Sequence, residues 1–166
     1  ISDDGASRRE YRVEKGSIEF RNVSFRYFKN VGAPVLDDVS VKIEPGEFVG
    51  IIGSTGSGKS TFVSLIPRLY DPDAGEVLVD GIDVKELSLH ELRESVAVVL
   101  QKNTLFSGTI AENLRWGNEE ASDEELEEVC RIAQADSFIR SFPDGYETQI
   151  GQGGGNLSGG QKQRLC

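Results

Sequence analysis

The sequence predicts an α/β fold in three parts: an antiparallel β subdomain, a partial parallel sheet with helices, and a helical subdomain at the carboxyl end. Residues 18–25 and 39–43 alternate apolar and polar side chains, as half-buried strands do. Residues 47–52 form a nearly continuous apolar run that leads into a glycine-rich loop. A buried parallel strand followed by a helix has this pattern.

Further elements follow from shorter patterns. Residues 29–33 are predicted as a turn, and residues 77–79 and 96–100 as strands. A Ser or Thr followed three residues later by Glu predicts a capping box that starts a helix. It occurs at Ser88 and Glu91, at Thr109 and Glu112, and at Ser122 and Glu125, the last heading a helix over 123–134. The glycines at 151–155 predict a flexible loop before a helix that begins near Ser158.

Composition and charge exclude several classes of partner. The 166 residues contain 18 Lys and Arg against 28 Asp and Glu, a net charge of -10. Nucleic acid and anionic lipid need a basic surface, so neither is expected as the main partner. Much of the acidic excess lies in residues 119–128, where a solvated helix explains it.

The length suits one domain or a piece of a larger protein. Residues 1–16 are polar and lack periodicity, which indicates a linker, so the folded part is expected over 17–166. The longest apolar run, 96–100, is far shorter than the about 20 residues of a membrane-spanning helix. Two cysteines, Cys130 and Cys166, make no disulfide framework, and a reducing cytosolic setting is expected.

The strongest motif is the glycine-rich loop, which fits G-x-x-x-x-G-K-[ST] between a predicted strand and a predicted helix. Its residues are Gly53, Ser54, Thr55, Gly56, Ser57, Gly58, Lys59, Ser60 and Thr61. Backbone amides and the helix start would hold phosphates. Lys59 would bridge the β- and γ-phosphates, Ser60 would ligate Mg²⁺, and Thr61 would support the α-phosphate. A plain glycine-rich turn explains the full match poorly, so the pattern indicates a P-loop NTPase core.

Two further segments narrow the class. Near the carboxyl end the sequence reads YETQIGQGGGNLSGGQKQRL, about a hundred residues after the P-loop, and VVLQ precedes LFSGTIAENL in between. Together with VSFRY at residues 23–27, these segments resemble the signature, Q-loop and A-loop of ATP-binding cassette (ABC) proteins of the exporter type. The resemblance runs from about Ser17 to the last residue and places the helical subdomain at about 102–166.

The resemblance implies a role for several single residues. Tyr27 would stack on adenine, although a tyrosine at a strand end is often only a packing residue. Gln101 would reach Mg²⁺ and the attacking water, or it is an ordinary polar group at a strand end. The signature residues would meet the γ-phosphate of ATP held by the other subunit, or they form a plain helix N-terminus. These residues are Ser158, Gly159, Gly160 and Gln161.

The sequence departs from the family pattern at two places. Exporters commonly have a glutamate where this chain has Gln152, which makes contact with the coupling helices there less certain. The sequence also ends at Cys166, before the region of the second Mg²⁺ anchor (Walker B), the general base and the switch histidine. We therefore expect an amino-terminal fragment of the domain, inactive as an ATPase by itself. His90, Trp116 and both cysteines match no motif and are expected to be structural.

The resemblance implies a parent protein that binds ATP and Mg²⁺ between two nucleotide-binding domains and hydrolyses the ATP to drive export. Its implied partners are the transmembrane domain of the same transporter and a second nucleotide-binding domain, at the cytoplasmic face of the cell membrane. Two alternatives remain open at this point. One is a soluble ABC ATPase of DNA repair or translation, and the other is a regulatory cassette that does not hydrolyse ATP.

Overall fold

The computed structural model describes residues 12–28 and 32–166. They divide into two compact units, unit 1 within residues 1–97 and unit 2 within residues 98–166. Each unit has its own core of buried side chains. None of the helices in the described ranges has both the length and the apolar character that a membrane crossing requires.

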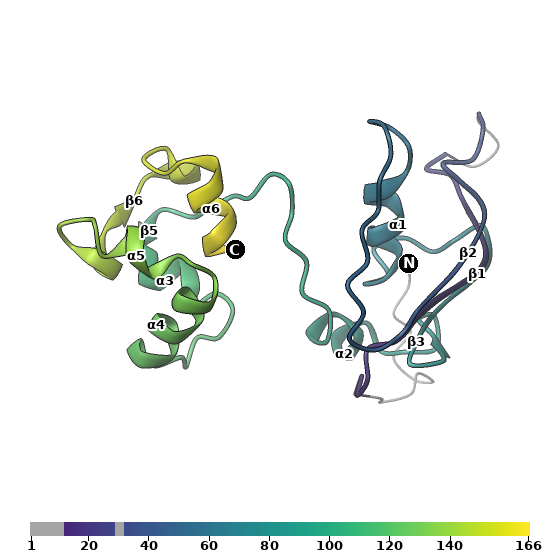
Figure 1. Cartoon of the computed structure of the whole chain (residues 1–166), viewed down its shortest axis with the longest axis horizontal. Coiled ribbons are helices and arrows are strands. Elements are labelled where there is room, and N and C mark those ends of the chain that lie inside the picture. The colour runs from purple at the N-terminus through teal and green to yellow at the C-terminus, as the bar shows by residue number, and fades with distance from the viewer. Residues whose placement is uncertain (1–11, 29–31) are drawn as a thin grey trace. The chain divides into compact units, whose positions relative to one another are not determined.

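Unit 1 contains a four-stranded antiparallel sheet in the order β2-β1-β3-β4. Figure 1 labels β1, β2 and β3 of this sheet. Strand β1 spans Ile18–Phe25 and β2 spans Leu36–Ile43, while β3 spans Ala74–Val79 and β4 spans Ile82–Asp83. The expected strands at 18–25, 39–43 and 77–79 are thus confirmed, the last two with earlier starts. The turn expected at 29–33 falls partly outside the described residues.

Strand β1 is irregular near its middle. The pairing with β3 shifts between Arg21 and Ser24, and Asn22 has a φ of 48°. Gly75 faces this bulge with a φ of 79°, and a Cβ there would lie 2.3 Å from the Arg21 carbonyl oxygen. The close approach of the two backbones therefore requires glycine at this position of β3.

Helix α1, Lys59–Leu65, packs on the sheet of unit 1. The rings of Phe62 on α1 and Phe20 on β1 stack with centroids 4.0 Å apart. Leu65, one turn further along α1, is fully buried in the same core. This packing sets the position of the glycine-rich loop, because α1 begins directly after Gly58.

Helix α2, Leu89–Glu94, begins after Ser88 as expected, but the Ser88 side chain makes no capping hydrogen bond. Its ψ is 133°, against 160° to 166° at the three serine or threonine caps whose side chains do bond. The N-cap side chain must reach the third amide of the helix, and this reach depends on the backbone angle. The capping box predicted at Ser88 and Glu91 is therefore wrong.

Neither the parallel strand expected at 47–52 nor the further strand expected at 96–100 is formed. Both segments are coil (Figure 1), and the strand pairs of the described residues are all antiparallel. Phe48 and Ile52 are fully exposed, and Leu100 is 59% exposed. A buried strand needs neighbours for its N–H and C=O groups, and no described segment pairs with either run. Mixed α/β architecture with an antiparallel subdomain remains as predicted.

Unit 2 is mainly helical around one short antiparallel pair. Strand β5, Gly108–Thr109, pairs with β6, Gln149–Ile150. The helices are α3, Ile110–Leu114; α4, Asp123–Ile132; α5, Asp136–Ile139; and α6, Gly159–Leu165, with 3₁₀ turns at Gly145–Glu147 and Gln152–Gly154. Their inner faces supply the core, which includes Ile110, Cys130, Ile139, Ile150 and Leu165.

The capping boxes expected at Thr109 and Ser122 are confirmed, each with its Glu three residues later. The acidic helix ends at Ile132, earlier than the expected 134. The glycine segment 151–155, expected as a flexible loop, contains a short 3₁₀ turn whose backbone leaves the helical region at Gly153, with a φ of 67°. Gly154 is buried there, and its amide donates to the Gly151 carbonyl oxygen at 2.8 Å.

The residues that matched no motif differ in their surroundings. Cys130 is buried in the core of unit 2, where burial raises the pKa of its thiol, while Cys166 and His90 are exposed. Trp116, expected to be structural, is 71% exposed and stacks on the half-exposed ring of Phe106. It therefore contributes to the surface of unit 2 more than to its core.

Candidate nucleotide-binding site

The glycine-rich loop ends in a left-handed residue at the start of α1. Gly58 is the N-cap, with a φ of 86°. A Cβ at Gly58 would lie 2.8 Å from the Val35 carbonyl oxygen and 3.0 Å from Leu36 Cδ2. Both the conformation and the contact with the start of β2 therefore select glycine. The first amides of α1, as in any helix, have no acceptor within the helix and are available to a phosphate.

Lys59 folds back over the loop that precedes it. Its Nζ donates to the Gly53 carbonyl oxygen at 2.8 Å and to the Ser54 carbonyl oxygen at 2.7 Å. Within the loop, the Ser57 amide donates to the Ser54 carbonyl oxygen at 3.2 Å. Residues 53–57 are exposed, so a ligand can reach the loop from solvent. The geometry places a positive charge beside carbonyl groups of the loop that leads into α1.

Thr61 connects the loop to a residue 34 positions earlier in the sequence. Its side chain is buried, and its Oγ1 lies 2.9 Å from the hydroxyl oxygen of Tyr27. Tyr27 follows the end of β1 and is 49% exposed. The structure thus brings together two residues that the sequence analysis assigned to the base and to the α-phosphate of one nucleotide.

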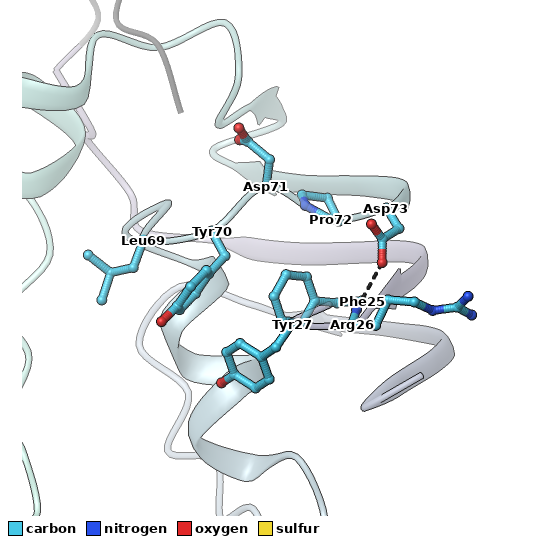
Figure 2. A pocket seen from close by; sticks show the side chains of 8 residues that line it. All are labelled: Phe25, Arg26, Tyr27, Leu69, Tyr70, Asp71, Pro72 and Asp73. Carbon is cyan, nitrogen blue, oxygen red and sulfur yellow. Dashed lines mark hydrogen bonds between the residues drawn. The ribbon is translucent and has the colours of Figure 1, made fainter. Parts of the chain in front are cut away.

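Tyr27 belongs to a cluster of three aromatic rings (Figure 2). Its ring meets that of Phe25 at 84° and that of Tyr70 at 88°, with centroids 5.1 Å and 5.3 Å away. The three rings and the segment 69–73 line a cavity of about 550 Å³. Both neighbours meet Tyr27 edgewise, so neither takes the parallel arrangement in which a planar base would stack.

The two carboxylates at this cavity are already hydrogen-bonded within the protein. Arg68 is buried, and its Nε donates to the Asp71 carboxylate at 2.6 Å. Partial burial alone would raise the pKa of Asp71, but the hydrogen bond and charge of Arg68 outweigh it, and the pKa lies below its ordinary value. Asp73 accepts the amide of Arg26 at 2.9 Å, and the Arg26 side chain points away from the rings (Figure 2). Both carboxylates therefore hold the cavity wall in place.

The signature residues form a helix N-terminus in unit 2. The Ser158 hydroxyl accepts the Gln161 amide at 3.3 Å, and the Gln161 side chain accepts the Ser158 amide at 2.8 Å. Gly159 and Gly160 are exposed, with no atom within 4 Å of a Cβ built on either. Leu157 and Leu165 are buried and fix the two ends of the segment in the core of unit 2. The helix near Ser158 is confirmed, and its start is open to solvent.

Metal ligands are sparse among the described residues, where no group of three or more His, Cys, Asp or Glu side chains could hold an ion. Ser60, exposed at the start of α1, offers a hydroxyl oxygen, and Gln101, exposed at the start of unit 2, offers an amide oxygen. Oxygen donors are what Mg²⁺ prefers, and Mg²⁺ completes its shell with phosphate oxygens and water. Each of the two side chains, taken by itself, therefore has the donor type that a nucleotide-bound Mg²⁺ accepts.

Sequence reasoning missed Tyr70 and Phe25 as neighbours of Tyr27. The three are separated by up to 45 positions, and antiparallel pairing of β1 with β3 brings them together. Position 70, in a stretch reading LYDPD, carries the pattern of a turn and gives no signal of this contact.

Comparison with known proteins decides the family. A family model described as ABC transporter matches residues 36–166. The chain belongs to this family. An ATP-dependent lipid A-core flippase of Chromobacterium violaceum is 47% identical over 99% of this chain, and ABC transporter B family member 2 of Dictyostelium discoideum is 42% identical over 100%. The chain spans only 28% and 12% of the lengths of these two relatives.

A solved structure, that of a bacterial Atm1-family ABC exporter with ATP bound, matches with a TM-score of 0.91 at 35% identity. The match covers 99% of this chain and 29% of that one. This ABC chain therefore has the fold of a nucleotide-binding domain, and exporters are among its relatives. The family resemblance stated from the P-loop, Q-loop and signature segments is confirmed.

Proposed function

We propose that this chain is the ATP-binding part of an ABC exporter, and that the whole transporter hydrolyses ATP to drive export across the membrane. The observation that carries the proposal is the position of Lys59, whose Nζ lies 2.8 Å and 2.7 Å from two carbonyl oxygens of the glycine-rich loop. A cation held on the loop that leads into a helix start, where amides are free, is suited to the β- and γ-phosphates of a nucleotide.

Each residue of the site has a distinct task in this proposal. Lys59 neutralises charge that develops on the γ-phosphate, and the amides of the loop orient the phosphates. Ser60 and Gln101 supply oxygen ligands to Mg²⁺, and Gln101 also orients the attacking water. When bound, Mg²⁺ screens the phosphate charge and polarises the γ-phosphate. Tyr27 offers its ring to the adenine, and Thr61 supports the α-phosphate.

The proposal extends to partners. Ser158, Gly159 and Gly160 form a second exposed helix start, and in unit 1 the P-loop has a helix start of its own. Two such ends are explained by two nucleotide-binding domains that meet head to tail, each supplying the signature for the ATP of the other. The greater length of the relatives supports a transmembrane domain as the other partner, with this domain at the cytoplasmic face of the membrane.

Equilibrium binding tests the proposal most directly. The 166-residue chain, shown to be folded by circular dichroism, is titrated with a fluorescent ATP analogue in the presence and absence of Mg²⁺. We expect saturable binding that Mg²⁺ strengthens and that unlabelled ATP and ADP displace. A folded chain that binds no nucleotide, or binds it equally well after Lys59→Ala, would contradict the assignment.

A further inference from the structure

Contacts with neighbouring side chains are needed to hold the Tyr27 ring in one orientation. It lies two residues beyond the last residue of β1, and about half of its surface is exposed. A ring so exposed changes rotamer readily unless its neighbours restrict it. The hydroxyl contact with Thr61 fixes one end of the side chain, at 2.9 Å. A hydroxyl contact by itself leaves the ring free to turn about its long axis.

Two edgewise ring contacts restrict this turning, one from Phe25 with centroids 5.1 Å apart and the other, on the exposed side, from Tyr70. Its ring meets the Tyr27 ring at 88° with centroids 5.3 Å apart, and it also touches Phe25, at 5.4 Å. Phe25 is 4% exposed and belongs to the core, whereas Tyr70 is 41% exposed. Tyr70 thus stands at the surface beside Tyr27, on the wall of the cavity shown in Figure 2.

The segment that carries Tyr70 is itself tied to the end of β1. The Asp73 amide donates to the Ser24 carbonyl oxygen at 2.9 Å, and the Asp73 carboxylate accepts the Arg26 amide at 2.9 Å. On the other side of Tyr70, Asp71 is paired with the buried Arg68. Tyr70 is therefore held from both sides, against the same strand that leads to Tyr27.

We infer that Tyr70 is a positioning residue of the base site: its edge contact holds the Tyr27 ring in the orientation in which a purine base stacks on it. The inference rests on the ATP site proposed above. Tyr70 acts through Tyr27 and not on the phosphates, because none of the P-loop residues lines the cavity that Tyr70 lines. Loss of the Tyr70 ring should therefore weaken the binding of nucleotides, which carry a base, and leave the binding of a triphosphate without a base unchanged.

The test compares two ligands on one set of variants. Dissociation constants are measured for Mg-ATP and for Mg-tripolyphosphate, which carries the charges without the base. Tyr70→Leu and Tyr70→Met keep apolar bulk without a ring, so the test survives if one of them fails to fold. We expect about two- to tenfold weaker binding of ATP and unchanged binding of tripolyphosphate. Tyr70→Phe, which keeps the ring, should restore the wild-type ratio.

Phe28→Leu is the matched control, because Phe28 is an exposed aromatic residue next to Tyr27 and lies outside the cluster of three rings. Its ratio of ATP to tripolyphosphate affinity should equal that of the wild type. The inference would be overturned if Tyr70→Leu weakened the binding of both ligands equally or left the ratio of their affinities unchanged. It would also be overturned if Tyr70→Phe failed to restore the wild-type ratio. These outcomes would leave the proposed ATP site standing. A wild-type chain that binds neither ligand would overturn the proposed ATP site as well.

Discussion

The ammonium group of Lys59 and the carbonyl oxygen of Ser54, five residues earlier, lie 2.7 Å apart. This contact closes the glycine-rich loop with the side chain to which the proposed function assigns phosphate binding. The lysine would then have two roles: its stem spans the loop, and its charge would attract a phosphate.

Replacing Lys59 should affect nucleotide binding far more than folding. Lys59→Ala removes a charged donor, and a hydrogen bond to a charged group contributes about 1.5 to 3 kcal/mol, equivalent to an about 10- to 150-fold loss of ATP affinity. Hydrolysis by the full transporter should fall to background. Lys42→Ala removes another lysine of unit 1, exposed on β2 and paired with Glu44, and should leave affinity unchanged. Near-normal hydrolysis by Lys59→Ala would refute the P-loop assignment.

Two glycines of the loop should differ in their tolerance of alanine. Gly56 and Gly58 have similar φ angles, 82° and 86°. An alanine at either position would therefore be strained by the left-handed conformation, which costs about 1 to 2 kcal/mol. A Cβ at Gly56 meets nothing within 4 Å, whereas at Gly58 it lies 2.8 Å from the Val35 carbonyl oxygen. Denaturant unfolding should show Gly58→Ala to be less stable than Gly56→Ala by about 1 kcal/mol or more. Equal stabilities would show that the start of β2 yields to the added methyl group.

The hydroxyl contact between Tyr27 and Thr61 can be measured by a double-mutant cycle. Tyr27→Phe and Thr61→Val each remove one partner of the 2.9 Å contact. Their combined effect on the free energy of unfolding should be smaller than the sum of the single effects by about 0.5 to 1.5 kcal/mol. Purely additive effects would mean that the two hydroxyls are not coupled in solution.

The ring of Tyr27 should matter for ATP binding independently of its hydroxyl. Tyr27→Ala removes the stacking surface and should weaken ATP binding several-fold, because base stacking on an aromatic ring contributes about 1 to 3 kcal/mol. Tyr27→Trp keeps a stacking face and should preserve most of the affinity. The two variants are compared by ATP titration, and an equal loss in both would indicate that Tyr27 serves packing alone.

Local patterns predicted local structure well, and contacts between distant residues were beyond their reach. The caps at Thr109 and Ser122 depend on residues three positions apart, so sequence alone identified them. The same signature failed at Ser88, where the ψ of 133° differs from that of the caps that bond, and the signature does not encode this angle. Residues 47–52 have the composition of a buried strand, but a strand also requires a partner, and among the described residues they have none. The Tyr27–Thr61 contact spans 34 positions, and only the fold reveals it.

Asp80 should make the stability of unit 1 depend on pH. Its carboxylate accepts the amides of Glu14, Lys15 and Ser17, each at 2.9 Å. Partial burial would raise the pKa of Asp80, but these backbone bonds outweigh it and lower the pKa below its ordinary value of 3.8. The lowered pKa means that the stabilisation is present above pH 3.8 and is lost as the pH falls through the folded-state pKa.

Asp80→Asn tests this dependence, since its amide nitrogen cannot accept a bond. The variant should be less stable than the wild type by about 1 kcal/mol between pH 5 and 7, and the difference should shrink below pH 4. Asp37→Asn, at an exposed position of β2, should match the wild type within about 0.5 kcal/mol. A constant difference down to acid pH would show that the ionised carboxylate is not what stabilises the contact.

Gly160 offers the clearest test of the proposed shared site. A Cβ there meets nothing within 4 Å, and an acidic residue in the first turn of α6 is favoured by the helix dipole, so Gly160→Asp should fold normally. Its carboxylate would stand where the γ-phosphate of the other subunit's ATP is expected. The variant chain should therefore bind ATP with wild-type affinity, while the dimeric transporter should lose hydrolysis.

Mixed dimers test whether Lys59 of one subunit and Gly160 of the other act in the same ATP site. When one subunit carries Lys59→Ala and the other Gly160→Asp, head-to-tail sharing places both lesions in one composite site and leaves the other intact. Such a dimer should retain up to about half of the wild-type ATP hydrolysis. A dimer in which one subunit carries both changes spreads them over both sites and should be inactive. If Gly160→Asp instead abolishes ATP binding by the single chain, the signature acts on the nucleotide of its own subunit, and the shared-site model fails.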